Sequence, residues 1–276
     1  MSPPEIFDRR RRRLARDRAA PAFADHAFVR AAMLDTIGER LAGVKRTFAD
    51  VLDLGCADGT FALTGARITR VDPGHAFAAR AGGVQADEDR LPSAAESFDL
   101  AIAAGTLDTV NDLPGAMTLI RRSLRPDGLF LGAFLGAGTL QMLRAVFREA
   151  EAERPAARFH PLVDVRSAGD LLVRAGFALP VADAETLTVR YASLTRLLAD
   201  VRGMAGGNQL AEVAPLRRET LARAAAAFDA RRDADGRVAE RFEFLVLTGW
   251  APSPDQPQPA RRGSATASLA TALRPR

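Results

Sequence analysis

The 276-residue sequence has a single cysteine, Cys56, so no disulfide can form within the chain. This cysteine usage suits a reducing compartment, and we expect a cytoplasmic protein. No apolar stretch approaches the ~20 residues of a membrane-spanning helix. The three histidines, His26, His75 and His160, are far apart and follow no metal-ligand spacing, so no metal site is expected.

Lysine is almost absent, since Lys45 is the only one among the 38 basic residues. The arginines are spread along the chain, which argues against a nucleic-acid-binding protein. The N-terminus is an exception, with Arg9–Arg13 followed by Arg16 and Arg18. Acidic residues interleave with this run, and we expect a solvated helix. Contact with an acidic partner, or peripheral contact with a membrane surface, is the alternative.

Apolar segments alternate with segments of helical periodicity along most of the chain. Strands are expected at 50–54, 68–72, 83–87, 98–104, 129–135, 184–191 and 242–250, and helices at 26–44, 60–66, 75–81, 112–124, 139–153 and 166–175. This order predicts an α/β fold with a seven-stranded, mostly parallel sheet and helices on both faces. The last strand is expected to pair antiparallel.

Three regions are expected: an N-terminal helical segment (1–45), an α/β domain (46–251) and a proline-rich C-terminal extension (252–276). Residues 193–232 are expected to form a helical insertion before the last strand. That insertion would cap the carboxyl edge of the sheet, where open α/β folds bind ligands.

The most informative segment is Val51–Gly59, in which a buried strand runs into a tight turn. Asp53 stands two positions before Gly55, and Ala57 and Gly59 follow at alternate positions. A strand, a turn and a helix N-terminus let the backbone approach a charged cofactor closely. The spacing is not the G-x-G-x-x-G of dinucleotide-binding folds. Ala57 adds a methyl group where glycine is usual, which the turn should tolerate if φ is negative there. Cys56 is expected to be a small packed residue.

Further acidic residues follow the next strands. Asp72 ends the second strand, 19 residues after Asp53, and a carboxylate there can hold two ribose hydroxyls. Asp87 and Glu88 follow the third strand, within Gln85–Pro92. Phe98–Ala104 is the fourth strand.

In this order, these segments resemble the motifs of class I S-adenosylmethionine (SAM) methyltransferases. The resemblance implies a Rossmann-like fold, SAM as the cofactor, and contact of Asp87 with the adenine amine. The cofactor-binding residues it implies are Asp53, Gly55, Cys56, Ala57, Gly59, Asp72, Pro73, Asp87, Glu88 and Ala104.

Asn111–Pro114 and Leu124–Gly128 resemble the type 11 branch of this class, which includes the malonyl-carrier-protein methyltransferases of biotin synthesis. A narrower resemblance, from near residue 7 to near residue 266, is to a family of arginine-hydroxylating assembly factors of respiratory complex I. It is carried by Phe7–Arg9, Gly136–Leu140, Arg174–Phe177, Gly249-Trp250 and Arg262–Ala265.

The chain departs from the assembly-factor pattern at three places. Asp108-Thr109 replaces a His-Trp pair, Gly138 replaces an aspartate, and Ser253-Pro254 replaces His-Glu. The first two lie near the expected substrate mouth. Cofactor binding therefore carries over from the resemblance better than the substrate does.

Three functions remain open from the sequence. The first is SAM-dependent methyl transfer to an unknown substrate, with Asp108 as a base or cation holder and Tyr191 orienting the substrate. Structural roles, in a loop for Asp108 and in the core for Tyr191, are the alternatives. The second is complex I assembly by hydroxylation of a partner subunit's arginine, which needs an oxidant. The third is a non-catalytic SAM-binding assembly protein. The partner is thus a protein substrate or a small molecule.

Overall fold

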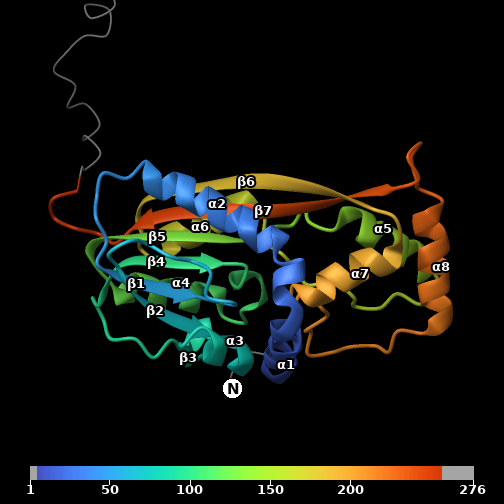
Figure 1. Ribbon diagram of the computed structural model, residues 1–276, viewed down its shortest axis with the longest axis horizontal. Helices are drawn as coiled ribbons and strands as arrows, with labels where there is room; N and C mark the ends of the chain where they lie inside the picture. Colours follow the sequence, from blue (N-terminus) through green and yellow to red (C-terminus); the bar gives the residue numbers. More distant parts are fainter. Residues whose placement is uncertain (1–4, 257–276) are drawn as a thin grey trace, which may run out of the picture.

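The computed structural model describes residues 5–256, and its centre is a seven-stranded sheet of order β3-β2-β1-β4-β5-β7-β6 (Figure 1). The strands are β1 (Asp50–Leu54), β2 (Arg67–Asp72), β3 (Val84–Gln85), β4 (Phe98–Ala104), β5 (Leu124–Leu135), β6 (Ala178–Tyr191) and β7 (Val238–Trp250). Strands β1 to β5 pair in parallel, while β7 runs antiparallel to β5 and β6. The expected fold class is confirmed, although β5 and β6 begin earlier than expected.

Both faces of the sheet are buried, because alternate residues of the central strands enter two separate cores. Val51 and Ile102 point into one core, under α2 (Phe28–Ala42) and α5 (Gln141–Ala150). Leu52 and Ala101 point into the other, under α4 (Leu113–Ser123) and α6 (Val165–Arg174). The near-continuous apolar runs of the sequence are therefore the signature of strands covered on both sides.

The helix expected at 60–66 is absent, and these residues form an extended loop with a turn. The connection must return from the carboxyl end of β1 to the start of β2. Seven helical residues would advance only about 10 Å, whereas the same residues extended reach about 23 Å. A strand of six residues spans about 20 Å, so this short crossover has no room for a helix.

The carboxyl ends of the parallel strands are covered by helices from both ends of the chain. The N-terminus forms α1 (Arg9–Ala19) and a 3₁₀ segment, η1 (Ala20–His26). The insertion between β6 and β7 forms α7 (Leu194–Gly203) and α8 (Arg218–Asp229). Helix α7 contacts α1 and η1, whereas α8 packs against α5. In Figure 1 the arrowhead of β4 points toward α1 and α7, which contact each other.

The switch in strand order falls between β1 and β4, because the chain continues from β1 to β2 on one side and from β4 to β5 on the other. Open α/β folds bind ligands outside the carboxyl ends of the strands at such a point. Within residues 5–256, none of the helices is long and apolar enough to cross a membrane. The C-terminal extension from residue 257 onward, with Arg262–Ala265, lies outside the described residues.

Candidate functional site

The turn after β1 lies against the end of β4. Gly55 has φ +62°, and a Cβ there would overlap the side chain of Thr106. Glycine is therefore required by both conformation and space. Ala57 has φ +48°, so the condition of a negative φ is not met and the turn holds an alanine where glycine would be free of strain. Left-handed backbone costs an L-residue about 1–2 kcal/mol, and this turn holds Ala57 in that conformation.

Asp53 is fully buried under this turn, and both of its carboxylate oxygens lack a hydrogen-bond partner among the described residues. Burial raises the pKa of Asp53 to about 7, while Arg30 and Arg70 act in the opposite direction. A buried, unpartnered carboxylate is costly unless a donor reaches it. Asp53 therefore fits a donor group of a bound cofactor, in line with its place among the expected cofactor-binding residues.

The other expected residues also meet here. Asp72 at the end of β2 accepts a hydrogen bond from the amide of Ala57 at 3.0 Å. Thr106, just beyond β4, bonds Glu88 of η2 (Glu88–Arg90). Pro73 and Ala104 are buried beside them. The turn, Asp72, Asp87 and Glu88 thus gather at the ends of four neighbouring strands.

These acidic residues are paired with arginines of the chain's own N-terminal helix. Arg16 donates to both oxygens of Asp72, and its Nε lies 2.7 Å from Oδ1. Arg12 donates to both oxygens of Glu88 at 2.7 and 2.9 Å. The helix α1 is therefore not the solvated helix expected from the sequence. Its partner is the carboxyl edge of the same chain.

Two more arginines of α1 complete this contact. Arg13 lies 2.7 Å from Asp87, and Arg9 bonds both oxygens of Asp89 at 2.7 Å. Asp87 keeps one buried oxygen without a hydrogen-bond partner. We call α1 and these four acidic residues the arginine clasp: Arg9, Arg12, Arg13 and Arg16 with Asp72, Asp87, Glu88 and Asp89.

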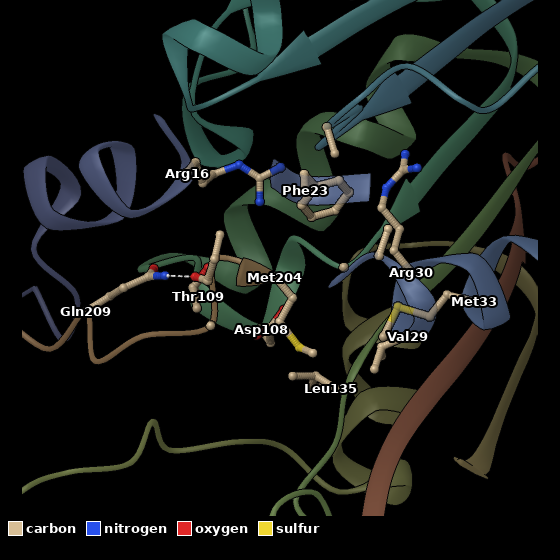
Figure 2. A pocket seen from close by; sticks show the side chains of 15 residues that line it. Arg16, Phe23, Val29, Arg30, Met33, Asp108, Thr109, Leu135, Met204 and Gln209 are labelled. Atoms are coloured by element: carbon tan, nitrogen blue, oxygen red, sulfur yellow. Dashed lines mark hydrogen bonds between the residues drawn. The ribbon is translucent and has the colours of Figure 1, made fainter. Parts of the chain in front are cut away.

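A small cavity of about 60 Å³ remains beside the turn. In the view of Figure 2, Phe23 lies between Arg16 and Arg30, while Asp108, Met204 and Leu135 stand at the other end. Sites for ligands of cofactor size usually measure about 300–1,000 Å³. The acceptor groups thus fit SAM by type, with Asp53 and one oxygen of Asp87 unpaired. The space beside the turn is smaller than such sites, because α1 covers the carboxyl edge.

Asp108 lies in η3 (Leu107–Thr109) and borders two cavities. Together with Leu135 and Gly206 it lines both the small cavity and a second cavity of about 300 Å³. Burial raises the pKa of Asp108, and Arg12 and Arg16 act against this rise. A carboxylate with raised proton affinity, facing two cavities, has the properties of a general base.

The second cavity was not foreseen from the sequence, because its wall comes from segments far apart in the chain. Most of its lining is apolar, including Leu140, Leu143, Phe147 and Phe159. Its charged groups are Asp108 and three arginines, Arg144, Arg158 and Arg202. The sequence pointed to Asp108 as a candidate base, to Leu140 through Gly136–Leu140, and to Leu143, Arg144 and Phe147 only through the helical periodicity of 139–153.

Tyr191 and Cys56 have no direct place at either cavity. Tyr191 is buried in the core beneath α7, and its hydroxyl lacks a hydrogen-bond partner among residues 5–256. Burial and the nearby Asp200 raise its pKa. Burial also raises the pKa of the Cys56 thiol to about 12, in keeping with a packed turn residue.

The carboxylate missing at Gly138 is replaced from another strand. Glu243 of β7 accepts a hydrogen bond from the Gly138 amide at 2.7 Å, and a Cβ at 138 would overlap this carboxylate. A carboxylate therefore lies next to position 138, with the guanidinium of Arg241 3.7 Å away from it. Among the described residues, no group of three or more His, Cys, Asp or Glu side chains could hold a metal ion.

Residues 24–180 match the family described as a methyltransferase domain. The arginine-hydroxylase NDUFAF5 of Danio rerio is 32% identical over 284 residues, covering 96% of this chain and 88% of that protein. The Homo sapiens protein of that name is 33% identical over 286 residues, covering 96% and 82%. A malonyl-[acyl-carrier protein] O-methyltransferase of Laribacter hongkongensis is 29% identical over 272 residues, covering 89% and 90%.

Solved structures agree on the fold. The YcgJ protein of Bacillus subtilis covers 79% of this chain and 99% of its own, with a TM-score of 0.57 and 15% identity. A SAM-dependent methyltransferase of Thermotoga maritima covers 87% of this chain and 99% of its own, with a TM-score of 0.53 and 17% identity. The chain belongs to the methyltransferase-domain family and has the class I SAM-dependent methyltransferase fold, as the sequence motifs predicted.

Proposed function

We propose that this protein transfers a methyl group from SAM to an acceptor bound in the second cavity. The observation that carries the proposal is the position of Asp108, which lines both the cavity beside the turn and the larger apolar cavity. SAM supplies a methyl group on a sulfonium, which needs little assistance to leave. Most of the catalysis then consists of holding the acceptor in line, which rigid cavity walls achieve.

The chain's own residues divide the remaining work. Asp53 holds the ammonium group of the cofactor, Asp72 its ribose hydroxyls, and Asp87 its adenine amine. Asp108 takes the proton from an acceptor hydroxyl or amine. Because Arg16 occupies both oxygens of Asp72, α1 must withdraw before SAM binds. We place the protein in the cytoplasm, in line with its single cysteine.

A second candidate is assembly of respiratory complex I by modification of a partner subunit's arginine. Similarity over 96% of this chain to proteins named arginine-hydroxylase favours it. The chemistry of the second cavity opposes it, because a guanidinium would meet three arginines and a single carboxylate there. A SAM-binding assembly protein without catalysis is the third candidate, and it shares only the cofactor site.

Two measurements separate these candidates. Calorimetry on refolded, cofactor-stripped protein is expected to show binding of SAM and of its demethylated product, S-adenosylhomocysteine. Mass spectrometry then compares a deletion strain with strains carrying the wild type or Asp108→Asn. We expect an acceptor molecule to carry one additional methyl group in the strain with the wild type and not in the deletion strain. The rate of methyl transfer by Asp108→Asn should be lower by about 10²-fold or more.

Other results would assign the protein differently. A gain of one oxygen on an arginine of a partner protein, absent from the deletion strain, would establish the second candidate. The third candidate is favoured if SAM binds but no molecule changes mass, and if Asp108→Asn fully restores the growth of the deletion strain. No binding of either SAM or S-adenosylhomocysteine would reject all three.

A further inference from the structure

Arg144 is a cation without a carboxylate partner at the wall of the second cavity. It lies in α5, and its guanidinium donates only to the backbone oxygens of Thr139 and His160, at 3.3 and 3.2 Å. No ion pair joins it to an acidic side chain of residues 5–256. Glu240, whose charge acts on Arg144, already accepts from the amides of Met142 and Leu143.

The other arginines of this cavity are in a different state. Arg158 is bound to Glu151 at 2.6 Å, which leaves little of its charge for a ligand. Arg202 is exposed to solvent. Arg144 is half-buried, and its guanidinium lies over the ring of Phe159, 5.0 Å from the ring centre. Stacking on a ring leaves the edge of a guanidinium free to donate.

A second polar group at the same wall also lacks a partner. Thr139 is 1% exposed, and its hydroxyl has no hydrogen-bond partner among the described residues although it borders the cavity. Buried hydroxyls are nearly always paired, so this one can gain a hydrogen bond from a polar group placed beside it. A hydroxyl and a guanidinium together provide the donors that a carboxylate accepts from.

We propose that the second cavity binds a small amphiphilic carboxylate, whose acid group is held by Arg144 and the Thr139 hydroxyl and whose apolar body fills the leucine- and phenylalanine-lined space. Arg, with its planar fork, matches a carboxylate better than a lysine would. The volume of about 300 Å³ suits one alkyl chain or one ring system.

The two ends of the cavity set the ligand's direction. Asp108 is on the side shared with the small cavity beside the turn, whereas Arg144 is on the side shared with a surface cavity that Arg148 and Glu151 also line. The acid group is therefore anchored on the outer side, and the other end of the ligand reaches Asp108. That this ligand is the methyl acceptor rests on the proposed function, but its binding does not.

The test is calorimetry with decanoate and with decanol, which share a chain and differ in charge. We expect decanoate to bind the full-length protein at least about tenfold more tightly than decanol, as a charge-assisted hydrogen bond implies. Arg144→Met should abolish that preference. Arg148→Met, an exposed arginine one turn further along α5, is the matched control and should keep it.

Thr139→Val provides a second, isosteric variant in case Arg144→Met does not fold. It should reduce decanoate binding several-fold and leave decanol binding unchanged. The proposal is overturned if neither probe binds, if both bind equally, or if Arg144→Met keeps the preference. Because no SAM is present in these titrations, a failure of methyl transfer leaves their result intact.

Discussion

The two cavities on either side of Asp108 are opposites in their electrostatics. At the cofactor edge, four acidic residues meet four arginines in the arginine clasp, and only about 60 Å³ of space is left. In the second cavity about 300 Å³ is open, and Arg144 has no acidic partner. The cofactor edge is therefore closed and its charges are paired, whereas the second cavity is open and the charge of Arg144 has no acidic partner among the described residues.

This difference separates pairs that hold the fold together from charges kept for a ligand. Breaking one partner of a buried ion pair leaves a buried charge uncompensated, which is strongly destabilising. A cation that bonds only backbone oxygens leaves no such charge behind. The cofactor edge should therefore respond to mutation mainly through stability, and the second cavity mainly through binding.

The largest effect is expected from Arg16→Met. It leaves Asp72, which is fully buried, without its bidentate partner, and should lower the free energy of unfolding by about 3–5 kcal/mol. Arg144→Met, at the other cavity, should change it by less than about 1 kcal/mol. Urea denaturation measures both. Equal losses for the two variants would erase the comparison.

The pH dependence of Asp53 comes next. Its pKa is raised to about 7, so between about pH 4 and 7 the folded state holds a proton that the unfolded state releases. The contribution of Asp53 to the free energy of unfolding should therefore fall as pH rises through this window, by up to about 4 kcal/mol. His160 acts in the opposite direction over part of the same window, because burial lowers its pKa to about 4. Asp53→Asn should remove the Asp53 component.

Urea denaturation of both proteins at a series of pH values isolates the Asp53 contribution as their difference. Asp89 and Asp99 have lowered pKa values, from the arginines that pair with them, and they act on stability only at lower pH. If the free energy of unfolding changes with pH in parallel for the wild type and Asp53→Asn, the Asp53 carboxylate already has a hydrogen-bond partner in the absence of a ligand.

Asp72→Asn tests whether Asp72 contacts the cofactor. The dissociation constant for S-adenosylhomocysteine should rise about 10- to 100-fold, because charge-assisted hydrogen bonds to the ribose are lost. Asp89→Asn is the control, since it also releases an arginine of α1 but is not an expected cofactor contact. Calorimetry should find the control unchanged or tighter. If the affinity of Asp72→Asn for S-adenosylhomocysteine is unchanged, the cofactor does not bind at Asp72.

The smallest effect concerns the turn itself. Ala57→Gly relieves the positive φ, but it makes the unfolded chain more flexible and removes a buried methyl group, so the free energy of unfolding should change by less than about 0.5 kcal/mol. Ala76→Gly, within α3 (His75–Arg80), should instead cost about 1 kcal/mol. A loss in Ala57→Gly as large as in Ala76→Gly would mean that the turn stores no strain.

The sequence predicted the sheet well, because apolar runs of β1, β4, β5 and β7 follow directly from burial on both faces. It also brought Asp53, Asp72 and Asp87 to one edge through their places at strand ends. The helix at 60–66 was wrong, since apolar periodicity does not report the distance that a connection must cover. The sign of φ at Ala57 could not be read from the sequence for a related reason, because it is set by contacts of the whole turn.

Long-range pairing lay beyond the sequence. The arginines of α1 have the composition of a solvated helix, and only the fold shows that Asp72 and Glu88, more than fifty residues away, neutralise them. Likewise, no local pattern marks Arg144 or Thr139 as lacking a partner. Whether a charge is paired is a property of packing between distant segments.

The central claim is that SAM binds where the arginine clasp now closes the carboxyl edge. Hydrogen exchange with and without S-adenosylhomocysteine tests this most directly. We predict that the amides of α1 exchange faster when the ligand is bound, while those at the ends of β1 and β2 exchange more slowly. Absence of binding, or binding that slows exchange in α1, would contradict the account.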